Sequence, residues 1–230
     1  MMRLTASTFL NTGSLFLALL YAGGATAQTC PQLQPEHRFV LVRGENTLPD
    51  GKTQPVATCI SRQNAVATID TLGDDGKVLM RARYQGHKAL SHENLKRNLV
   101  SETRYSDDGQ SVLHAKSGQT LKYSVKTLVP GKADAELHVT HVIGDASTTM
   151  ISGCELAILA ERRQNVETTG RVTAYQLSYA PALNWPVYSQ STALNRSVDG
   201  PKLTPGPVFR LLEISPADEA QRVCEAAQTP

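Results

Sequence analysis

The chain has 230 residues, of which 40% are hydrophobic, and its 23 Lys and Arg residues nearly balance 21 Asp and Glu residues. This near-neutral charge argues against a nucleic-acid partner, because proteins that bind nucleic acids usually present a basic face. The length allows one domain or two small ones, and we expect one.

Residues 1–27 have the order of a secretory signal peptide. Arg3 supplies a positive charge, an apolar run follows from Leu15 to Ala22, and Ala25-Thr26-Ala27 is a small-residue cleavage site. The apolar run is too short to span a bilayer. We therefore expect cleavage after Ala27, which leaves one β-rich domain over residues 28–230 that has no membrane span and is periplasmic or secreted.

Four cysteines follow this segment: Cys30, Cys59, Cys154 and Cys224. An even number of cysteines in an exported chain predicts structural disulfides. The favoured pairing joins Cys30 to Cys59 and Cys154 to Cys224, because these pairs close the shorter loops. The spacings contain no CxxC and do not match a zinc site, so we expect neither a metal nor another cofactor.

Residues 28–64 form an N-terminal segment ahead of a sheet that we expect over residues 65–214. Within the sheet, the runs AVATIDTL and KVLMRARY flank GDDG, and the runs LVSETRY and QSVLHAK flank SDDG. Each arrangement predicts a β-hairpin, because Asp-Gly turns tolerate positive φ angles. The polar residues 86–98 between the hairpins are either a loop or a short helix capped by Ser91.

The next run, TLKYSVKTLV, contains six residues in which apolar and polar side chains alternate. Leu121, Tyr123 and Val125 alternate with Lys122, Ser124 and Lys126. This pattern predicts a strand with one packed face and one wet face in an antiparallel sheet.

The rest of the chain predicts more strands and then a helix. Strands are expected near residues 137–143, 155–162, 172–179, 187–191 and 208–214. Residues 215–228 predict a helix with Ser215 as N-cap, Pro216 at the first position, and Asp218 and Glu219 near the positive end of the dipole. The predicted fold is mainly β: an antiparallel meander forming a curled sheet or half-barrel, with a short C-terminal α-helix.

The histidines give no metal or catalytic pattern. His138 and His141 lie three residues apart on an expected strand, so they point to opposite faces and cannot share one ion. His87 and His92 lack the HExxH arrangement and are expected at the surface. GxSxG and SxxK are also absent from the sequence, so we expect no catalytic residue.

The stretch YAPALNWPVYSQS, Tyr179 to Ser191, contains the single tryptophan, Trp185. Pro181 ends one strand, because proline donates no ladder hydrogen bond, and Val187 begins the next, so the proline-containing run is a strand connection. In the arrangement ISGCELAILAERR, TAYQLSYAPALNWPVYSQS and VFRLLEIS, the chain resembles the C-terminal part of uncharacterised exported bacterial β-rich proteins. These are similar to the lipoprotein-carrier half-barrel, and the resemblance covers residues 147–215. It implies an antiparallel sheet curled round an apolar concave surface, and no catalytic residue.

Two functions from different classes follow. In the first, a non-catalytic protein binds a hydrophobic or acyl ligand on the concave face, in a cavity lined by Tyr175, Leu177, Tyr179, Trp185 and Val187. In the second, the core is filled and the domain is a protein–protein interaction module for a cell-envelope partner. The low aromatic content of 5% favours a filled core, since ligand pockets tend to be lined by aromatic side chains. An enzyme without a recognisable motif is the third and most distant alternative.

Overall fold

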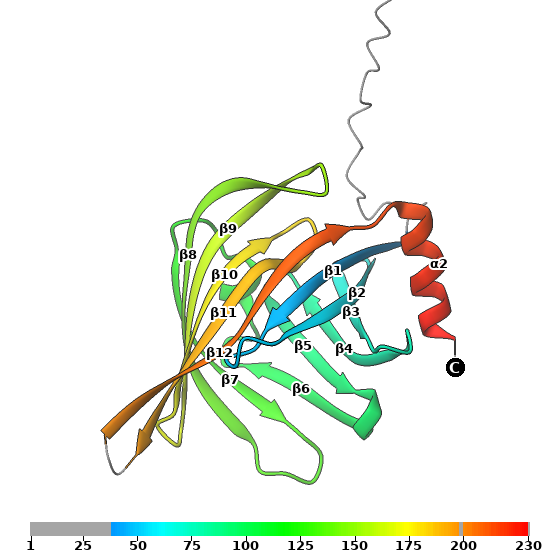
Figure 1. Ribbon diagram of the computed structural model, residues 1–230. Helices are drawn as coiled ribbons and strands as arrows, with labels where there is room; N and C mark the ends of the chain where they lie inside the picture. The colour runs from blue at the N-terminus through cyan, green and yellow to red at the C-terminus, as the bar shows by residue number, and fades with distance from the viewer. Residues whose placement is uncertain (1–37, 198–199, 230) are drawn as a thin grey trace, which may run out of the picture.

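The computed structural model describes residues 38–197 and 200–229, and these residues form a closed antiparallel β-barrel (Figure 1). The strands are β1 (Phe39–Thr47), β2 (Thr53–Gln63), β3 (Val66–Leu72), β4 (Val78–Gln85), β5 (Lys88–Asn94), β6 (Leu99–Tyr105), β7 (Thr120–Leu128), β8 (Ala135–Ile151), β9 (Cys154–Glu167), β10 (Val172–Ala180), β11 (Trp185–Ser197) and β12 (Gly200–Ile214). The helices are η1 (Leu95–Arg97), which is a 3₁₀ helix, α1 (Gln110–Leu113) and α2 (Ala217–Gln228). The predicted signal peptide lies outside the described residues. No described helix is long and apolar enough to cross a membrane.

The mainly β fold and the C-terminal helix are confirmed, but the half-barrel is wrong because the sheet closes. Strand β1 pairs on one side with β2 and on the other with β12, so that Val42 lies opposite both Thr58 and Ile214. The sheet therefore begins at Phe39 rather than at residue 65. Strand β1 shows no alternation because Phe39 to Val42 are all buried, which makes one continuous apolar run.

The first predicted hairpin is confirmed and the second is wrong. Strands β3 and β4 pair across a turn in which the Gly73 amide donates to the Lys77 carbonyl at 2.8 Å. In the second, residues 110–113 form α1 rather than a strand, and β6 pairs with β7 instead. The Asp107 carboxylate accepts hydrogen bonds from the Gly109 and Ser111 amides, and such local bonding favours a helical turn over a strand.

The segment left open at residues 86–98 forms strand β5 and then η1. Ser91 does not cap a helix, since it lies within β5 opposite Arg83 of β4 and Glu102 of β6. The Asn94 side chain caps η1 by accepting a hydrogen bond from the Arg97 amide.

The five later strands are confirmed with wider bounds. Strand β11 begins at Trp185, two residues earlier than expected, because Trp185 pairs with Ala180 of β10. Between them, residues 181–184 form a tight turn in which the Asn184 amide donates to the Pro181 carbonyl. Residues 181–184 therefore connect strands β10 and β11, as predicted from Pro181.

Alternation along the strands separates an inner from an outer set of side chains. Val40 and Val42 of β1 pack with residues of β9, β10 and β11, which are not neighbours of β1 in the sheet, so these contacts lie inside the barrel. The inner apolar core includes Val40, Ile60, Leu156, Ala180, Val187 and Phe209.

Helix α2 covers the outer face of β1 and β2 (Figure 1). Phe39 and Leu41 pack there against Ala220 and Cys224 of α2. Cys224 is bonded to Cys59 of β2, so the favoured pairing of Cys154 with Cys224 and of Cys30 with Cys59 is wrong. Loop length misled the prediction, because barrel closure brings β2 beside the C-terminal helix. Cys154 is buried in the inner core, and Cys30 lies outside the described residues.

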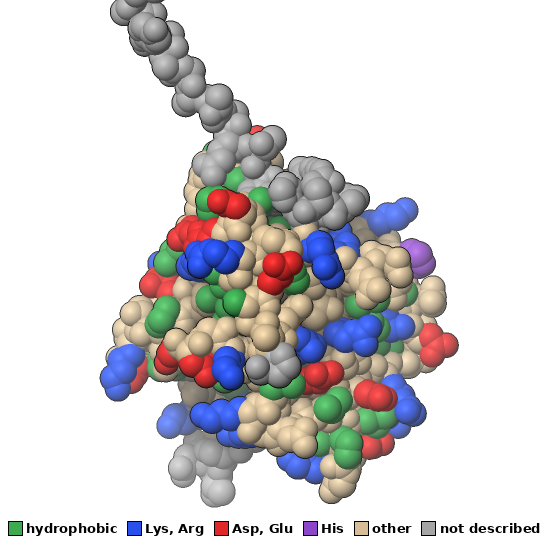
Figure 2. All heavy atoms as spheres, turned by 90° about the vertical axis from the view of Figure 1, so that its right-hand side faces the viewer, with side chains coloured by type: hydrophobic (Ala, Val, Ile, Leu, Met, Phe, Trp, Pro, Cys, Tyr) green, Lys and Arg blue, Asp and Glu red, His purple; other side chains and the backbone are tan. Residues whose placement is uncertain are grey.

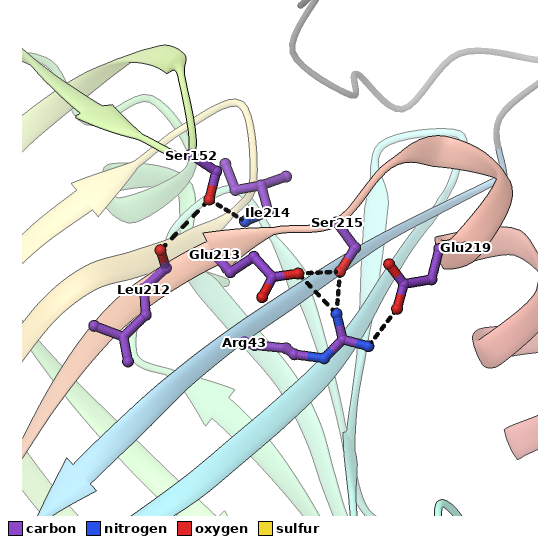
Figure 3. Close-up of polar contacts among 7 residues, drawn as sticks. All are labelled: Arg43, Ser152, Leu212, Glu213, Ile214, Ser215 and Glu219. Carbon is purple, nitrogen blue, oxygen red and sulfur yellow. Dashed lines mark hydrogen bonds and ion pairs between the residues drawn. The ribbon is translucent and has the colours of Figure 1, made fainter.

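A polar cluster joins the start of α2 to the barrel (Figure 3). The Arg43 guanidinium of β1 donates to Glu213 of β12 at 2.9 Å, to Glu219 of α2 at 2.7 Å and to the Ser215 hydroxyl. The helix begins at Ala217, so its N-cap is Pro216, which makes no side-chain cap hydrogen bond, and the predicted N-cap Ser215 and first helical residue Pro216 are each one residue too early.

The turn between β8 and β9 bends over one end of the barrel and contacts β12 (Figures 1 and 3). The Ser152 hydroxyl accepts a hydrogen bond from the Ile214 amide at 3.3 Å and donates to the Leu212 carbonyl.

The outer face on which α2 lies has Lys and Arg side chains interspersed with Asp and Glu (Figure 2).

Candidate functional site

A cavity of about 250 Å³ lies inside the barrel, between the inner core and the turn that joins β4 to β5. Its apolar wall is formed by Tyr84, Leu177, Tyr179, Trp185 and Pro186. Its polar wall is formed by His87, His141, Glu161, Arg163 and Asn184. The lining therefore combines apolar and polar side chains, which are neighbours where Leu177 lies directly opposite Glu161 across β10 and β9.

The polar wall is built on a buried carboxylate between two imidazoles. His141 Nε2 of β8 lies 3.0 Å from Glu161 Oε2 of β9, and the two side chains are 4% and 2% exposed. His87, in the turn after β4, places its Nδ1 3.4 Å from Glu161 Oε1, which is an ion-pair distance without hydrogen-bond geometry. Each of the two carboxylate oxygens thus faces one imidazole.

The strand register explains how these groups meet. Across β8 and β9, His141 lies opposite Arg163 and Ile143 lies opposite Glu161, so the His141–Glu161 contact is a diagonal pair on the inner face. His87 reaches the same place from the β4–β5 turn, and its ring contacts that of Tyr179 at 4.4 Å between centroids. Two consecutive strands and the distant β4–β5 turn therefore bring these side chains together.

Arg163 extends this wall toward β10. Its guanidinium lies over the ring of Tyr175, its cross-strand neighbour, at 4.7 Å from the ring centroid. Such a cation–π contact fixes the direction of the side chain and leaves its remaining N–H groups available.

Several buried polar atoms of the cavity wall have no hydrogen-bond partner. Among the described residues eight such side-chain atoms occur, and four belong to the cavity: His141 Nδ1, Glu161 Oε1, Arg163 Nε and Trp185 Nε1. An unpaired buried polar atom costs about 1–3 kcal/mol, so native proteins satisfy nearly all of them with protein, water or ligand. This clustering makes the cavity the candidate site for a polar group.

Burial sets the charge state of the aromatic residues around the cavity. Burial lowers the pKa of His87 below its usual value; the nearby Glu161 carboxylate opposes this effect, and His141 and Arg163 add to it. Burial also raises the pKa of Tyr179, with Glu161 adding to the effect. Near neutral pH, His87 is therefore a neutral imidazole with a lone pair, and Tyr179 keeps its proton.

A groove of about 300 Å³ adjoins the cavity. It shares Gly86, His87, Tyr179 and Asn184 with the cavity, and Arg62 and Asn64 line its outer part. The proline-containing turn of residues 181–184 thus forms part of the groove.

The structure brings three of the five predicted ligand residues to the cavity. Leu177, Tyr179 and Trp185 line it, whereas Val187 lies in the inner core. Tyr175 does not line the cavity, although it contacts Arg163, which does. The role of these residues in binding stays a prediction.

The polar wall was missed from the sequence, and His87 and His92 were wrongly placed at the surface. Both are half-buried, and His92 packs edge-on against Tyr84. The opposite directions of His138 and His141 are confirmed, since His138 is exposed and bonds Ser124. One signal was available: His141 occupies a position where Leu137, Val139 and Ile143 continue an apolar alternation.

Comparison with known proteins gives a structural likeness but no match in sequence. No protein-family model matches the chain, and no curated protein does. Among solved structures, the chain is similar to the crystal structure of the hypothetical lipoprotein YmcC from Escherichia coli (K12), at 13% sequence identity and a TM-score of 0.44. The alignment covers 80% of this chain and 87% of that chain.

Proposed function

We propose that the protein is a non-catalytic binding protein of the periplasm or the extracellular space that holds a small amphipathic molecule inside its barrel. The observation that carries this proposal is the set of four unpartnered buried polar atoms on the wall of one cavity. The apolar residues of the same lining, such as Leu177 and Trp185, would contact the apolar part of the ligand. Ligand sites typically combine such an apolar lining with a few placed polar groups.

The volume and the polar groups define the ligand class. About 250 Å³ is slightly below the usual range of about 300–1,000 Å³, so the cavity suits a short apolar chain, and a longer chain would extend into the groove. Arg163 Nε and Trp185 Nε1 are donors, whereas Glu161 Oε1 is an acceptor. The favoured head group is therefore uncharged and both donates and accepts, as a hydroxyl does.

The test uses Trp185 fluorescence, because this is the single tryptophan of the chain. Octanol, octanoate and octylammonium present one apolar chain with three different head groups, and each is titrated in the presence of EDTA. We expect saturable changes in emission, with the tightest binding for octanol. Ammonium should bind most weakly, because it would place a second cation beside Arg163.

A pair of neighbouring arginines provides the matched control. Arg163 lines the cavity, whereas Arg162 points to the exposed outer face. Arg163→Met should weaken octanol binding, and Arg162→Met should leave it unchanged. If no probe changes the emission and native mass spectrometry finds no adduct, the cavity-binding proposal fails. The envelope-partner alternative would then be favoured, with the exposed apolar side chains Met150, Leu203 and Leu212 as its starting point.

A further inference from the structure

We propose that His87, His141 and Glu161 together bind one divalent transition-metal ion, such as Zn²⁺, on the polar wall of the cavity. This inference goes beyond the binding of an organic ligand and does not depend on it. An ion could be held by these three side chains whether or not the apolar wall is occupied.

The donor set has the chemistry of a zinc site. Two imidazole nitrogens and one carboxylate are a known three-residue set for Zn²⁺, in which the fourth position is left to water or another ligand. In this structure one ligand atom from each of the three residues lies within 4.8 Å of the others. The three residues fit a single ion without any change of fold.

The distances also fit. Ligand atoms about 2.0–2.1 Å from a tetrahedral ion lie about 3.3 Å from one another. His141 Nε2 lies 3.0 Å from Glu161 Oε2, and His87 Nδ1 lies 3.4 Å from Glu161 Oε1, so each imidazole is near this distance from one of the two carboxylate oxygens. The carboxylate and the His141 imidazole are held by two paired strands, and His87 is in a turn that can make a small adjustment.

A second observation points to a ligand rather than to a closed internal network. Both side chains are buried, with Glu161 2% and His141 4% exposed, yet Glu161 Oε1 and His141 Nδ1 have no hydrogen-bond partner. A self-sufficient His–Glu–His arrangement would leave neither atom unpaired. An ion bound to Glu161 Oε1 would satisfy that atom directly, whereas His141 Nδ1 is the ring nitrogen on the far side from the Nε2–Oε2 contact.

The neighbouring charges are consistent with one cation. Glu161 is the only acidic residue on the cavity wall, and Arg163 is the only residue there with a permanent positive charge. Tyr84, Tyr179 and Asn184 are uncharged at neutral pH. Arg163 disfavours a second cation, so we expect one ion and no binuclear centre.

The experiment is a calorimetric titration of tag-free, EDTA-treated mature protein with Zn²⁺, without any organic probe. We expect one equivalent to bind and the unfolding temperature to rise. His87→Gln and Glu161→Gln should each weaken binding by more than about 100-fold, which exceeds the usual effect of losing an outer-shell partner. His138→Gln is the matched control. His138 lies on the outer face of β8, the strand that carries His141, so its replacement should leave Zn²⁺ binding unchanged.

Two outcomes would overturn the proposal. In one, the wild-type protein binds no stoichiometric Zn²⁺. In the other, His87→Gln binds Zn²⁺ as tightly as the wild type, which would place the ion elsewhere, for example at a cysteine. His87 lies in a turn, so this variant decides the question even if Glu161→Gln does not fold, and circular dichroism verifies its fold. Because probe binding is measured in EDTA, failure here leaves the proposed function untouched.

Discussion

Glu161 and His141 face one another inside the barrel, with Oε2 3.0 Å from Nε2, although neither is the direct cross-strand partner of the other. The inner face of β8 and β9 is therefore polar at this level, where a barrel of this kind would ordinarily be filled by apolar side chains. The other oxygen of Glu161 faces His87, and the lowered pKa of His87 links this polar region to the pH dependence of the fold.

We predict that the protein loses stability as the pH falls below about 6.5. Burial is the largest cause that lowers the folded-state pKa of both His87 and His92 below the unfolded value of about 6.5. Between the two values the unfolded chain binds more protons, so the free energy of unfolding rises with pH through this window. The contribution of the two neutral histidines to the free energy of unfolding is complete above about pH 6.5, and it is lost as the pH falls through their folded-state pKa values.

Urea unfolding at pH 7.5 and pH 5.5 measures this effect away from the range in which exposed carboxylates titrate. The double variant His87→Gln/His92→Gln should show a smaller pH dependence than the wild type. An equal dependence in both proteins would show that other groups are responsible. His114→Gln is the control, since His114 is in the exposed segment after α1.

The disulfide between Cys59 and Cys224 should contribute substantially to stability. It joins residues 165 positions apart, and loss of a native disulfide typically costs about 2–5 kcal/mol. We expect the free energy of unfolding of the Cys59→Ser/Cys224→Ser variant to be lower than that of the wild type by an amount in this range, measured by urea unfolding under non-reducing conditions. The double variant avoids a lone thiol that could mispair. A loss below about 1 kcal/mol would mean that packing of α2 on β1 and β2 is sufficient.

Arg43 should hold the start of α2 to the barrel through its contacts with Glu213, Ser215 and Glu219. Its side chain is 35% exposed, so solvent screening reduces the strength of these ion pairs. We expect Arg43→Met to lower the free energy of unfolding by about 1–2 kcal/mol. Arg210→Met, at an exposed position of β12, should change it little. Equal losses in the two variants would contradict a specific role for Arg43.

Local patterns in the sequence predicted the elements that depend on local physics. The alternation around Tyr123 identified β7, and Pro216 with Asp218 and Glu219 placed the start of α2 within two residues. Strand β1 was missed because it is covered by the barrel core on one face and by α2 on the other, which removes the alternation that marks a strand.

The features that depend on closure could not be derived in the same way. Closure of the barrel places β12 beside β1, so α2, which follows β12, packs on β1 and on its neighbour β2. The Cys59–Cys224 disulfide forms there because Cys59 is in β2 and Cys224 is in α2. The polar wall likewise needs His87 from one turn and Glu161 from a strand on another part of the barrel. A single sequence carries no direct signal for such contacts, apart from the histidine in the apolar alternation of β8.

The most direct test of ligand binding inside the barrel is the indole N–H signal of Trp185 in a ¹⁵N-labelled sample. The chain has one tryptophan, so one indole signal is expected, and its Nε1 is a buried atom of the cavity wall without a hydrogen-bond partner. We predict that octanol shifts this signal saturably in the wild type and in Arg162→Met, and more weakly in Arg163→Met. An indole signal that stays in place up to the solubility limit of octanol would contradict the account.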